Sequence, residues 1–259
     1  MCLIAFAWNT HPRWRLLLAG NRDEFHARPS AALVPWDDAP ILGGRDLQAG
    51  GTWLGVTAAG RCCVVTNVRD PHDPQRGVSR GMLVTDFLRG DHPAASHAQQ
   101  LLQSAAAYRP FNLLTFDQHD AYFVGNQPQP RAQAVLPGVH GLSNADFNTP
   151  WPKTRGLMLR LRDWMDHGGD EDFSSLFDAL ADEQVAADAQ LPDTGVGIER
   201  ERWLSSAFIR GELYGTRAST VVAIGHDHAG IIVERRFETN GRFDGETALT
   251  FGARSALPA

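Results

Sequence analysis

The residue whose position most strongly suggests chemistry is Cys2, which only Met1 precedes. Removal of Met1 is expected because the next side chain is small. The new terminus would carry a thiol and an α-amine, with ordinary pKa values of about 8.5 and about 8, so both groups could react near neutral pH. The amine could take the thiol proton directly, and the pattern therefore predicts a nucleophile that carries its own base. The alternative is that Cys2 is a small buried core residue.

A second set of candidates is the tetrapeptide Asn21-Arg22-Asp23-Glu24, which follows a predicted strand over residues 14–20. In extended backbone, Asn21 and Asp23 face one way and Arg22 and Glu24 the other. An arginine beside a thiol lowers the pKa of that thiol, and it can also hold a carboxylate or carbonyl of a substrate. Either Asp23 or Glu24 could orient the α-amine. A solvated charged turn is the alternative.

Two asparagines and a late arginine also stand at predicted strand ends. Asn67 ends a strand over 61–68, and Asn144 follows a strand over 140–143. Asparagine amides are suitable donors to the oxyanion that forms during acyl transfer, although asparagine is also common in turns. Arg217, just before a strand over 219–224, could place a second positive charge in a pocket or lie on the surface.

The elements that must position these residues are mostly strands. Residues 2–8 are apolar on both faces and predict a buried first strand, which would hold Cys2 rigidly. Further strands are predicted at 52–57, 111–116, 121–124 and 230–237, and helices at 78–88, 94–108, from Pro150 onward and at 173–181. Residues 27–51 and 182–197 are expected to be loops. Strands at both ends, with helices between strand pairs, favour an α+β fold of layered antiparallel sheets.

The overall composition excludes several classes of function. The chain has 259 residues, 43% hydrophobic and 21% charged, as expected of a globular protein. A net charge of −6 gives no basic surface for nucleic acid. With three cysteines, two of them adjacent, there is no disulfide framework, and we expect a cytoplasmic protein without a transmembrane segment. His226 and His228 are expected in an exposed turn, so no metal site is predicted.

Several motifs together resemble the NRDE family, also called the transport and Golgi organisation protein two family. The resemblance spans nearly the whole chain as a single domain, residues 1–259. Its motifs here are Met1-Cys2, Asn21-Arg22-Asp23-Glu24, Gly50-Gly-Thr-Trp-Leu-Gly55, Thr66-Asn67, Phe111-Asn-Leu-Leu114, Gly125-Asn126, Gly141-Leu-Ser-Asn144, Thr149-Pro-Trp-Pro152 and Tyr214-Gly-Thr-Arg217.

This family is similar to N-terminal nucleophile (Ntn) hydrolases of the choloylglycine hydrolase and penicillin acylase type. The resemblance implies a four-layer αββα sandwich. It also implies Cys2 as nucleophile, Arg22 with Asp23 or Glu24 beside it, Asn67 and Asn144 at the oxyanion and Arg217 in the pocket. Those hydrolases space the arginine and acid more widely than Arg22 and Asp23 stand here.

Two functions are compatible with this resemblance. The first is a hydrolase or acyltransferase that acts on an amide or thioester of a small molecule through Cys2, without a cofactor. The second is a non-catalytic carrier of haem, lipid or acyl-CoA, in which Cys2 or a histidine would ligate haem iron and arginines would pair with propionates.

Overall fold

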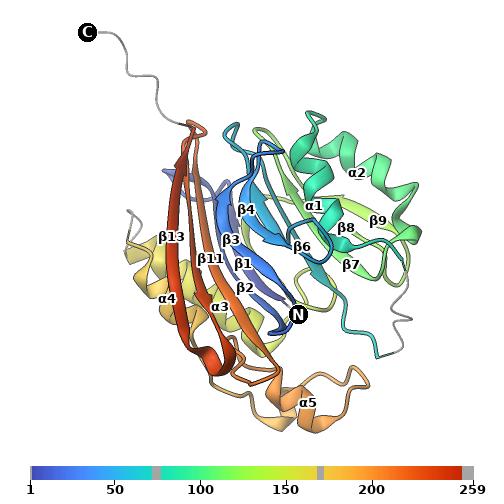
Figure 1. The fold of residues 1–259 in the computed structure, drawn as a ribbon, viewed down its shortest axis with the longest axis vertical. Coiled ribbons are helices and arrows are strands. Elements are labelled where there is room, and N and C mark those ends of the chain that lie inside the picture. The colour runs from blue at the N-terminus through green and yellow to red at the C-terminus, as the bar shows by residue number, and fades with distance from the viewer. Residues whose placement is uncertain (1, 72–76, 168–171, 253–259) are drawn as a thin grey trace.

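The computed structural model describes residues 2–71, 77–167 and 172–252, and it consists of two antiparallel sheets packed face to face with helices outside (Figure 1). Met1 lies outside the described residues, so its removal stays a prediction. Helices cover the outer face of each sheet, and the predicted four-layer αββα sandwich is confirmed. Among the described residues, no helix is both long and apolar enough to cross a membrane.

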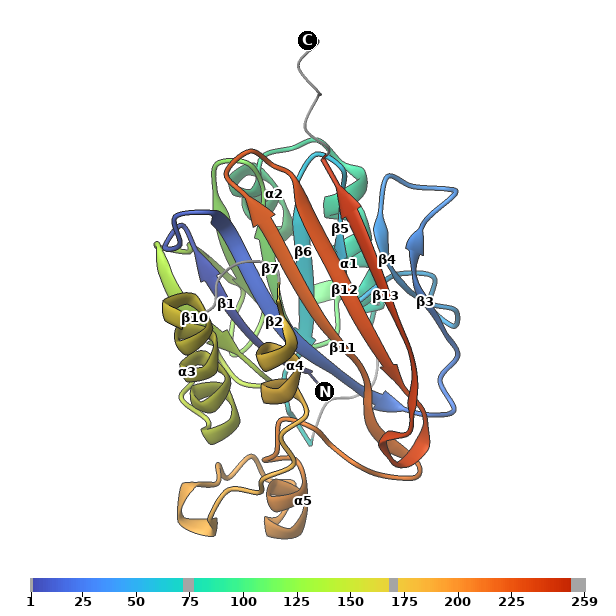
Figure 2. The same cartoon turned by 90° about the vertical axis from the view of Figure 1, so that its left-hand side faces the viewer.

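In the described residues the first sheet, sheet A, contains six strands, of which five come from the two ends of the chain and β10 comes from its middle. Their spatial order is β10-β1-β2-β11-β12-β13. The strands are β1 (Cys2–Trp8), β2 (Trp14–Phe25), β10 (Gly138–Leu142), β11 (Tyr214–Gly225), β12 (Gly230–Phe237) and β13 (Phe243–Phe251). Figure 2 shows that β11 from the C-terminal region runs beside β2 from the N-terminal region, with β12 on the far side of β11.

The second sheet, sheet B, is built from one contiguous stretch of chain. The seven strands found among its described residues lie in the order of the sequence, β3-β4-β5-β6-β7-β8-β9. They are β3 (Ser30–Pro35), β4 (Leu42–Asp46), β5 (Leu54–Val56), β6 (Cys62–Asn67), β7 (Phe111–Phe116), β8 (Ala121–Gly125) and β9 (Arg131–Ala134).

Helices form the two outer layers. Helices α1 (Arg80–Arg89) and α2 (Ala94–Leu102) cover sheet B, whereas α3 (Pro152–His167) and α4 (Ser174–Leu180) cover sheet A (Figures 1 and 2). A short helix, α5 (Ile198–Trp203), lies beyond the end of the sandwich. Short 3₁₀ helices in the part of the chain that the structure describes are Ala105–Ala107, Asp188–Gln190 and Thr239–Gly241.

The alternation of side chains along β1 explains why this strand is apolar throughout. Ile4, Phe6 and Trp8 pack in the core between the sheets, and Leu3 and Ala5 pack against α3 and α4. All these side chains are at most 2% exposed. Because side chains on both faces remove apolar surface from water, β1 is fixed from two sides, and Cys2 is held at its first position.

Several sequence predictions were wrong. Residues 27–51 were expected to be a loop, but they contain β3 and β4. Each of these strands has a single buried position and no regular apolar alternation, and they contain Pro35, Gly43 and Gly44, so the sequence did not indicate strands. The expectation of a first helical turn at Pro150 was also wrong, since α3 begins at Pro152. Strands β9 and β13 and helix α5 were not predicted.

Candidate active site

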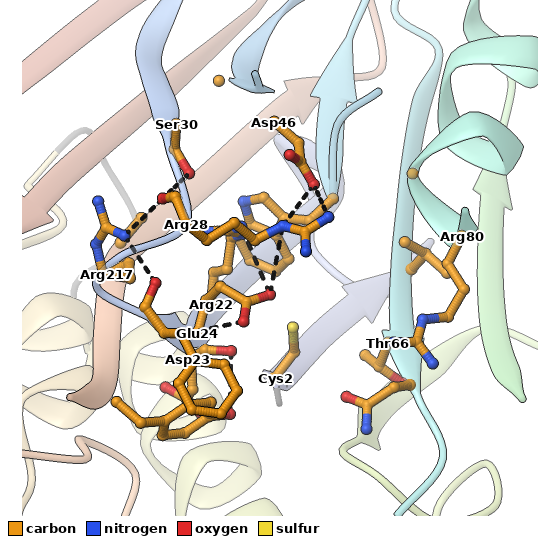
Figure 3. Close-up of a pocket in the computed structure, with 18 of the residues that line it drawn as sticks. Cys2, Arg22, Asp23, Glu24, Arg28, Ser30, Asp46, Thr66, Arg80 and Arg217 are labelled. Atoms are coloured by element: carbon orange, nitrogen blue, oxygen red, sulfur yellow. Dashed lines mark hydrogen bonds and ion pairs between the residues drawn. The ribbon is translucent and has the colours of Figure 1, made fainter. Parts of the chain in front are cut away.

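A cavity of about 1050 Å³ opens between the two sheets at the end where β1 begins. Figure 3 shows Cys2 and Arg22 on one side of this pocket, with Thr66 and Arg80 across from them. The structure brings six of the candidate residues into the lining: Cys2, Arg22, Asp23, Glu24, Asn67 and Arg217. The seventh, Asn144, does not belong to the lining; it is 1% exposed and lies behind Asn67.

Cys2 lines the pocket, and the residue is only 7% exposed. It stands directly opposite Arg22 in the β1–β2 ladder, so both side chains leave the same face of sheet A. Burial raises the pKa of the thiol, Asp23 adds to the rise, and Arg22 opposes it without reversing it. Arg22 thus acts on the thiol in the expected direction, but the pKa of Cys2 is raised overall, because desolvation outweighs one guanidinium. A base is needed to deprotonate this thiol.

The NRDE tetrapeptide is part of β2 and alternates between the two faces of sheet A, as predicted. Arg22 and Glu24 reach the inter-sheet pocket, where their charged groups are 3.8 Å apart. Asn21 points the other way and donates to backbone carbonyls beside α4, those of Leu180 and Ala207. Since the alternative of a solvated turn would leave these groups exposed, the burial of Asn21 excludes it.

The two acids of the tetrapeptide occupy different environments. Asp23 is 2% exposed, and its Oδ1 accepts a hydrogen bond of 2.7 Å from Thr216. Burial raises the pKa of Asp23, whereas the charge of Lys153 and the bond from Thr216 oppose that rise. Glu24 is more exposed and lies 3.9 Å from Arg28. Asp23 is therefore the acid that is enclosed beside the start of β1.

Asn67 and Asn144 are joined to each other and to Cys2. The Asn144 amide donates to the Asn67 side-chain oxygen over 3.0 Å, and the Asn67 amide donates to Val68 O over 3.2 Å. Ser143 completes the connection, because its hydroxyl donates to Cys2 O over 2.9 Å. The two asparagines thus belong to one network at the nucleophile, with Asn67 as the member that faces the pocket.

Arg217 reaches the pocket through an irregularity in β11. Thr216 pairs with Asp23 and Ala218 with Arg22, so Arg217 is an extra residue in the ladder. Such a bulge redirects a side chain that regular pairing would place elsewhere. The Arg217 guanidinium donates to three backbone carbonyls of the turn after β2, at 3.1–3.2 Å. It therefore fixes that turn as well as lining the pocket.

Sequence reasoning missed a buried ion pair behind the asparagines. The Arg69 guanidinium pairs with Glu201 of α5, and both side chains are at most 5% exposed. The backbone N–H of Arg69 donates to Asn144 O over 2.7 Å, and its guanidinium lies 4.6 Å from the Trp151 ring. Arg69 thus connects α5 to the Asn144 loop. The Ile198–Trp203 sequence reads as a charged surface segment, which concealed this role.

Lys153 was also missed. It is the second residue of α3, only 7% exposed, and its charge acts on Asp23 and Cys2. The Thr149-Pro-Trp-Pro152 motif stands directly before it and was its only signal in the sequence.

The described residues contain no group of three His, Cys, Asp or Glu side chains placed to hold a metal ion. His226 and His228 lie in the β11–β12 turn, where His226 is exposed and His228 half-buried. The part of the pocket lining that the structure describes includes no histidine, so of the two kinds of haem ligand expected from the sequence, it contains the cysteine, Cys2.

Comparisons with known proteins agree with this architecture. The Transport and Golgi organisation 2 family profile matches residues 1–239. The human Transport and Golgi organization protein 2 homolog is 32% identical over 91% of this chain and 92% of its own length. The mouse homolog is 30% identical over 93% and 97%.

Among solved structures, a mutant conjugated bile acid hydrolase from Clostridium perfringens superposes with a TM-score of 0.51 at 9% identity, covering 95% of this chain and 92% of that one. Two antiparallel sheets with helices outside are thus shared at very low sequence identity. The chain belongs to the Transport and Golgi organisation 2 family, and its fold is that of the Ntn hydrolases.

Proposed function

We propose that this protein is a cysteine hydrolase or acyltransferase that cleaves an amide or thioester of an anionic small molecule, with Cys2 as nucleophile. The observation that carries the proposal is the placement of Cys2 in the lining of a pocket, directly opposite Arg22 and next to the Asn67–Asn144 network. A nucleophile, a cation and one amide donor, Asn67, thus line the same cavity, and these are the groups that acyl transfer needs.

The reaction would proceed in two steps once the chain begins at Cys2. The α-amine takes the thiol proton, and the Cys2 sulfur attacks the carbonyl carbon. The resulting oxyanion accepts hydrogen bonds from the Asn67 amide, held in place by Asn144. Collapse expels the amine or thiol, which leaves with the proton from the α-amine. Water, or another acyl acceptor, then attacks the acyl-cysteine and gives the product and free Cys2.

The charges of the pocket favour an anionic substrate. Nine arginines line it against seven carboxylates, in a chain whose net charge is −6. Arg28 is already paired with Asp46 at 2.6 Å. Arg22 is only 13% exposed, and its ion pair with Glu24 is long, at 3.8 Å. A guanidinium is suited to a bidentate contact with a carboxylate or phosphate, so Arg22 is the proposed anchor for a negative group.

The test uses glutaryl-4-nitroanilide, an anionic amide that releases coloured 4-nitroaniline, and the S-phenyl thioester of glutaric acid. We expect turnover of at least one probe and a mass increase on the Cys2 peptide that corresponds to the glutaryl group. Cys2→Ser should abolish both, whereas Cys62→Ser, in a fully buried thiol, should abolish neither. Equal turnover by Cys2→Ser and the native protein would refute the proposal.

The second candidate is a carrier of an anionic lipid, acyl-CoA or haem, which the same arginine-rich pocket also favours. A carrier needs the arginines but not an oxyanion site. Asn144→Ala should therefore slow hydrolysis and leave ligand affinity unchanged if the protein is a hydrolase. Unchanged hydrolysis together with weakened ligand binding would favour the carrier.

A further inference from the structure

Lys153 is the only lysine in the chain, in which every other strongly basic side chain is an arginine. Surface lysines are common because an ammonium is strongly hydrated, yet this one is only 7% exposed. Its Nζ finds no hydrogen-bond acceptor among residues 2–71, 77–167 and 172–252. Burying an ammonium in this way is unfavourable, so the position requires a reason other than solubility.

The charged and titratable groups around Lys153 come from four other segments. Burial lowers the pKa of Lys153 to about 8, while the Asp23 carboxylate is the first of the groups that oppose this. The groups whose charges act on Lys153 are Asp23 of β2, Arg69 after β6, Cys2 of β1 and Glu201 of α5. Glu201 is engaged by Arg69, which leaves Asp23 as the carboxylate that Lys153 chiefly stabilises.

The surroundings of Asp23 complete the arrangement. The groups that act on its charge include Lys153, Arg22, Arg69 and Tyr214, and Thr216 donates to its Oδ1. Asp23 lines the pocket beside Cys2, but Lys153 does not line it. Lys153 is therefore placed to act on the carboxylate and not on a molecule in the pocket.

We propose that Lys153 is a positioning residue whose ammonium keeps the Asp23 carboxylate charged beside Cys2, so that this carboxylate can hold the α-amine of a chain that begins at Cys2. The inference rests on the proposed function and extends it to a residue outside the pocket. A charged Asp23 accepts the N–H groups of the amine and orients its lone pair toward the thiol. A neutral Asp23 would bind the amine less well, and the thiol would lose its base.

The direct test is the titration of Lys153 by NMR with ¹³Cε-labelled lysine, which gives a single signal because the chain has one lysine. In Asp23→Asn, the pKa of Lys153 should fall by about one unit or more, because its main opposite charge is lost. The matched control is Glu246→Gln, which removes a carboxylate paired with Arg235 on the exposed edge of sheet A. An unchanged Lys153 pKa in Asp23→Asn would overturn the proposal.

The second test follows hydrolysis of glutaryl-4-nitroanilide against pH. Lys153→Met should move the acid limb of kcat to higher pH and lower kcat at pH 7 by roughly tenfold, with KM unchanged. In the Asp23→Asn background, Lys153→Met should have no further effect, because the group it acts through is gone. If Lys153→Met lowered kcat equally at every pH, or lowered it further in the Asp23→Asn background, the role of Lys153 would be merely structural.

The two proposals fail in different ways. If the native protein cleaves neither glutaryl probe, the proposed function fails, and the NMR titration still decides whether Lys153 and Asp23 are coupled. If Cys2-dependent hydrolysis is found but its pH profile is the same in Lys153→Met, the proposed function stands and the role of Lys153 is refuted.

Discussion

The side-chain amide of Asn144 donates to Asn67 twice, to the backbone carbonyl and to the side-chain oxygen, each over 3.0 Å. Asn144 is buried, whereas Asn67 faces the pocket. The two residues therefore have separate tasks in the proposed reaction: Asn67 presents an amide to the oxyanion, and Asn144 sets its orientation.

The first prediction concerns these amides. Asn144→Ala should reduce kcat by roughly 100–1000-fold, the usual effect of losing an oxyanion donor, because Asn67 would lose the partner that orients it. The rate of glutaryl-4-nitroanilide cleavage measures this. Asn126→Ala is the control, since Asn126 is also a buried asparagine but bonds to Phe111 and Ala105. Equal losses in both variants would contradict the assignment.

The second prediction concerns the three thiols. Iodoacetamide should modify Cys2 at least about tenfold faster than Cys62 or Cys63, because only Cys2 lines the pocket. The other two are 0% exposed, and burial raises the pKa of each thiol. Peptide mapping after partial labelling gives the three rates. Labelling of Cys62 as fast as Cys2 would show that sheet B opens readily and would remove the argument for a distinctive thiol.

The third prediction is a stability change at the Arg69–Glu201 pair. Glu201→Gln should lower the free energy of unfolding by about 3 kcal/mol, because it removes the carboxylate that pairs with a buried guanidinium. The exposed Arg202–Asp188 pair provides the comparison, and Asp188→Asn should cost less than about 1 kcal/mol. Urea unfolding measures both. A similar effect of the two substitutions would mean that the buried pair does not anchor α5.

The fourth prediction follows from the lowered pKa of Lys153. Because that pKa is about 8 in the folded protein and 10.5 ordinarily, protonation is disfavoured by folding. The native protein should therefore gain stability relative to Lys153→Met as pH rises from about 8 to about 10.5, by up to roughly 3 kcal/mol. Below pH 8, ionisation of Lys153 should no longer change the difference in the free energy of unfolding between the two proteins. Denaturant midpoints across this pH range give the difference.

Local patterns in the sequence were sufficient to predict the fold class and the elements around the nucleophile. The apolar run of β1 and the alternation of Asn21 to Glu24 between two faces depend only on the order of residues along a strand, so they could be predicted from the sequence. The bulge at Arg217 could not, because it exists only in the pairing of β11 with β2. Likewise, the burial of Lys153 and Glu201 depends on distant partners, whereas their own segments appear polar.

Strand β13 shows the opposite limit of sequence reasoning. Its residues from Phe243 onward are mostly exposed or half-buried, and they carry Asp244 and Glu246. An edge strand protected by charge has little apolar pattern, so it was not recognised. Its place beside β12 is determined by backbone pairing, which composition does not reveal.

The strand order of the two sheets has a consequence for synthesis on the ribosome. Sheet B, from Ser30 to Ala134, is a continuous meander, and all its strands are made before β11 exists. Asp23, by contrast, is synthesised 193 residues before Thr216, the residue whose hydroxyl donates to its carboxylate. Because contacts between distant segments form late, we expect the wall of the pocket beside Cys2 to be completed among the last steps of folding. A nascent chain would thus present its thiol without a site around it, and any activity would begin only when the whole domain had been made.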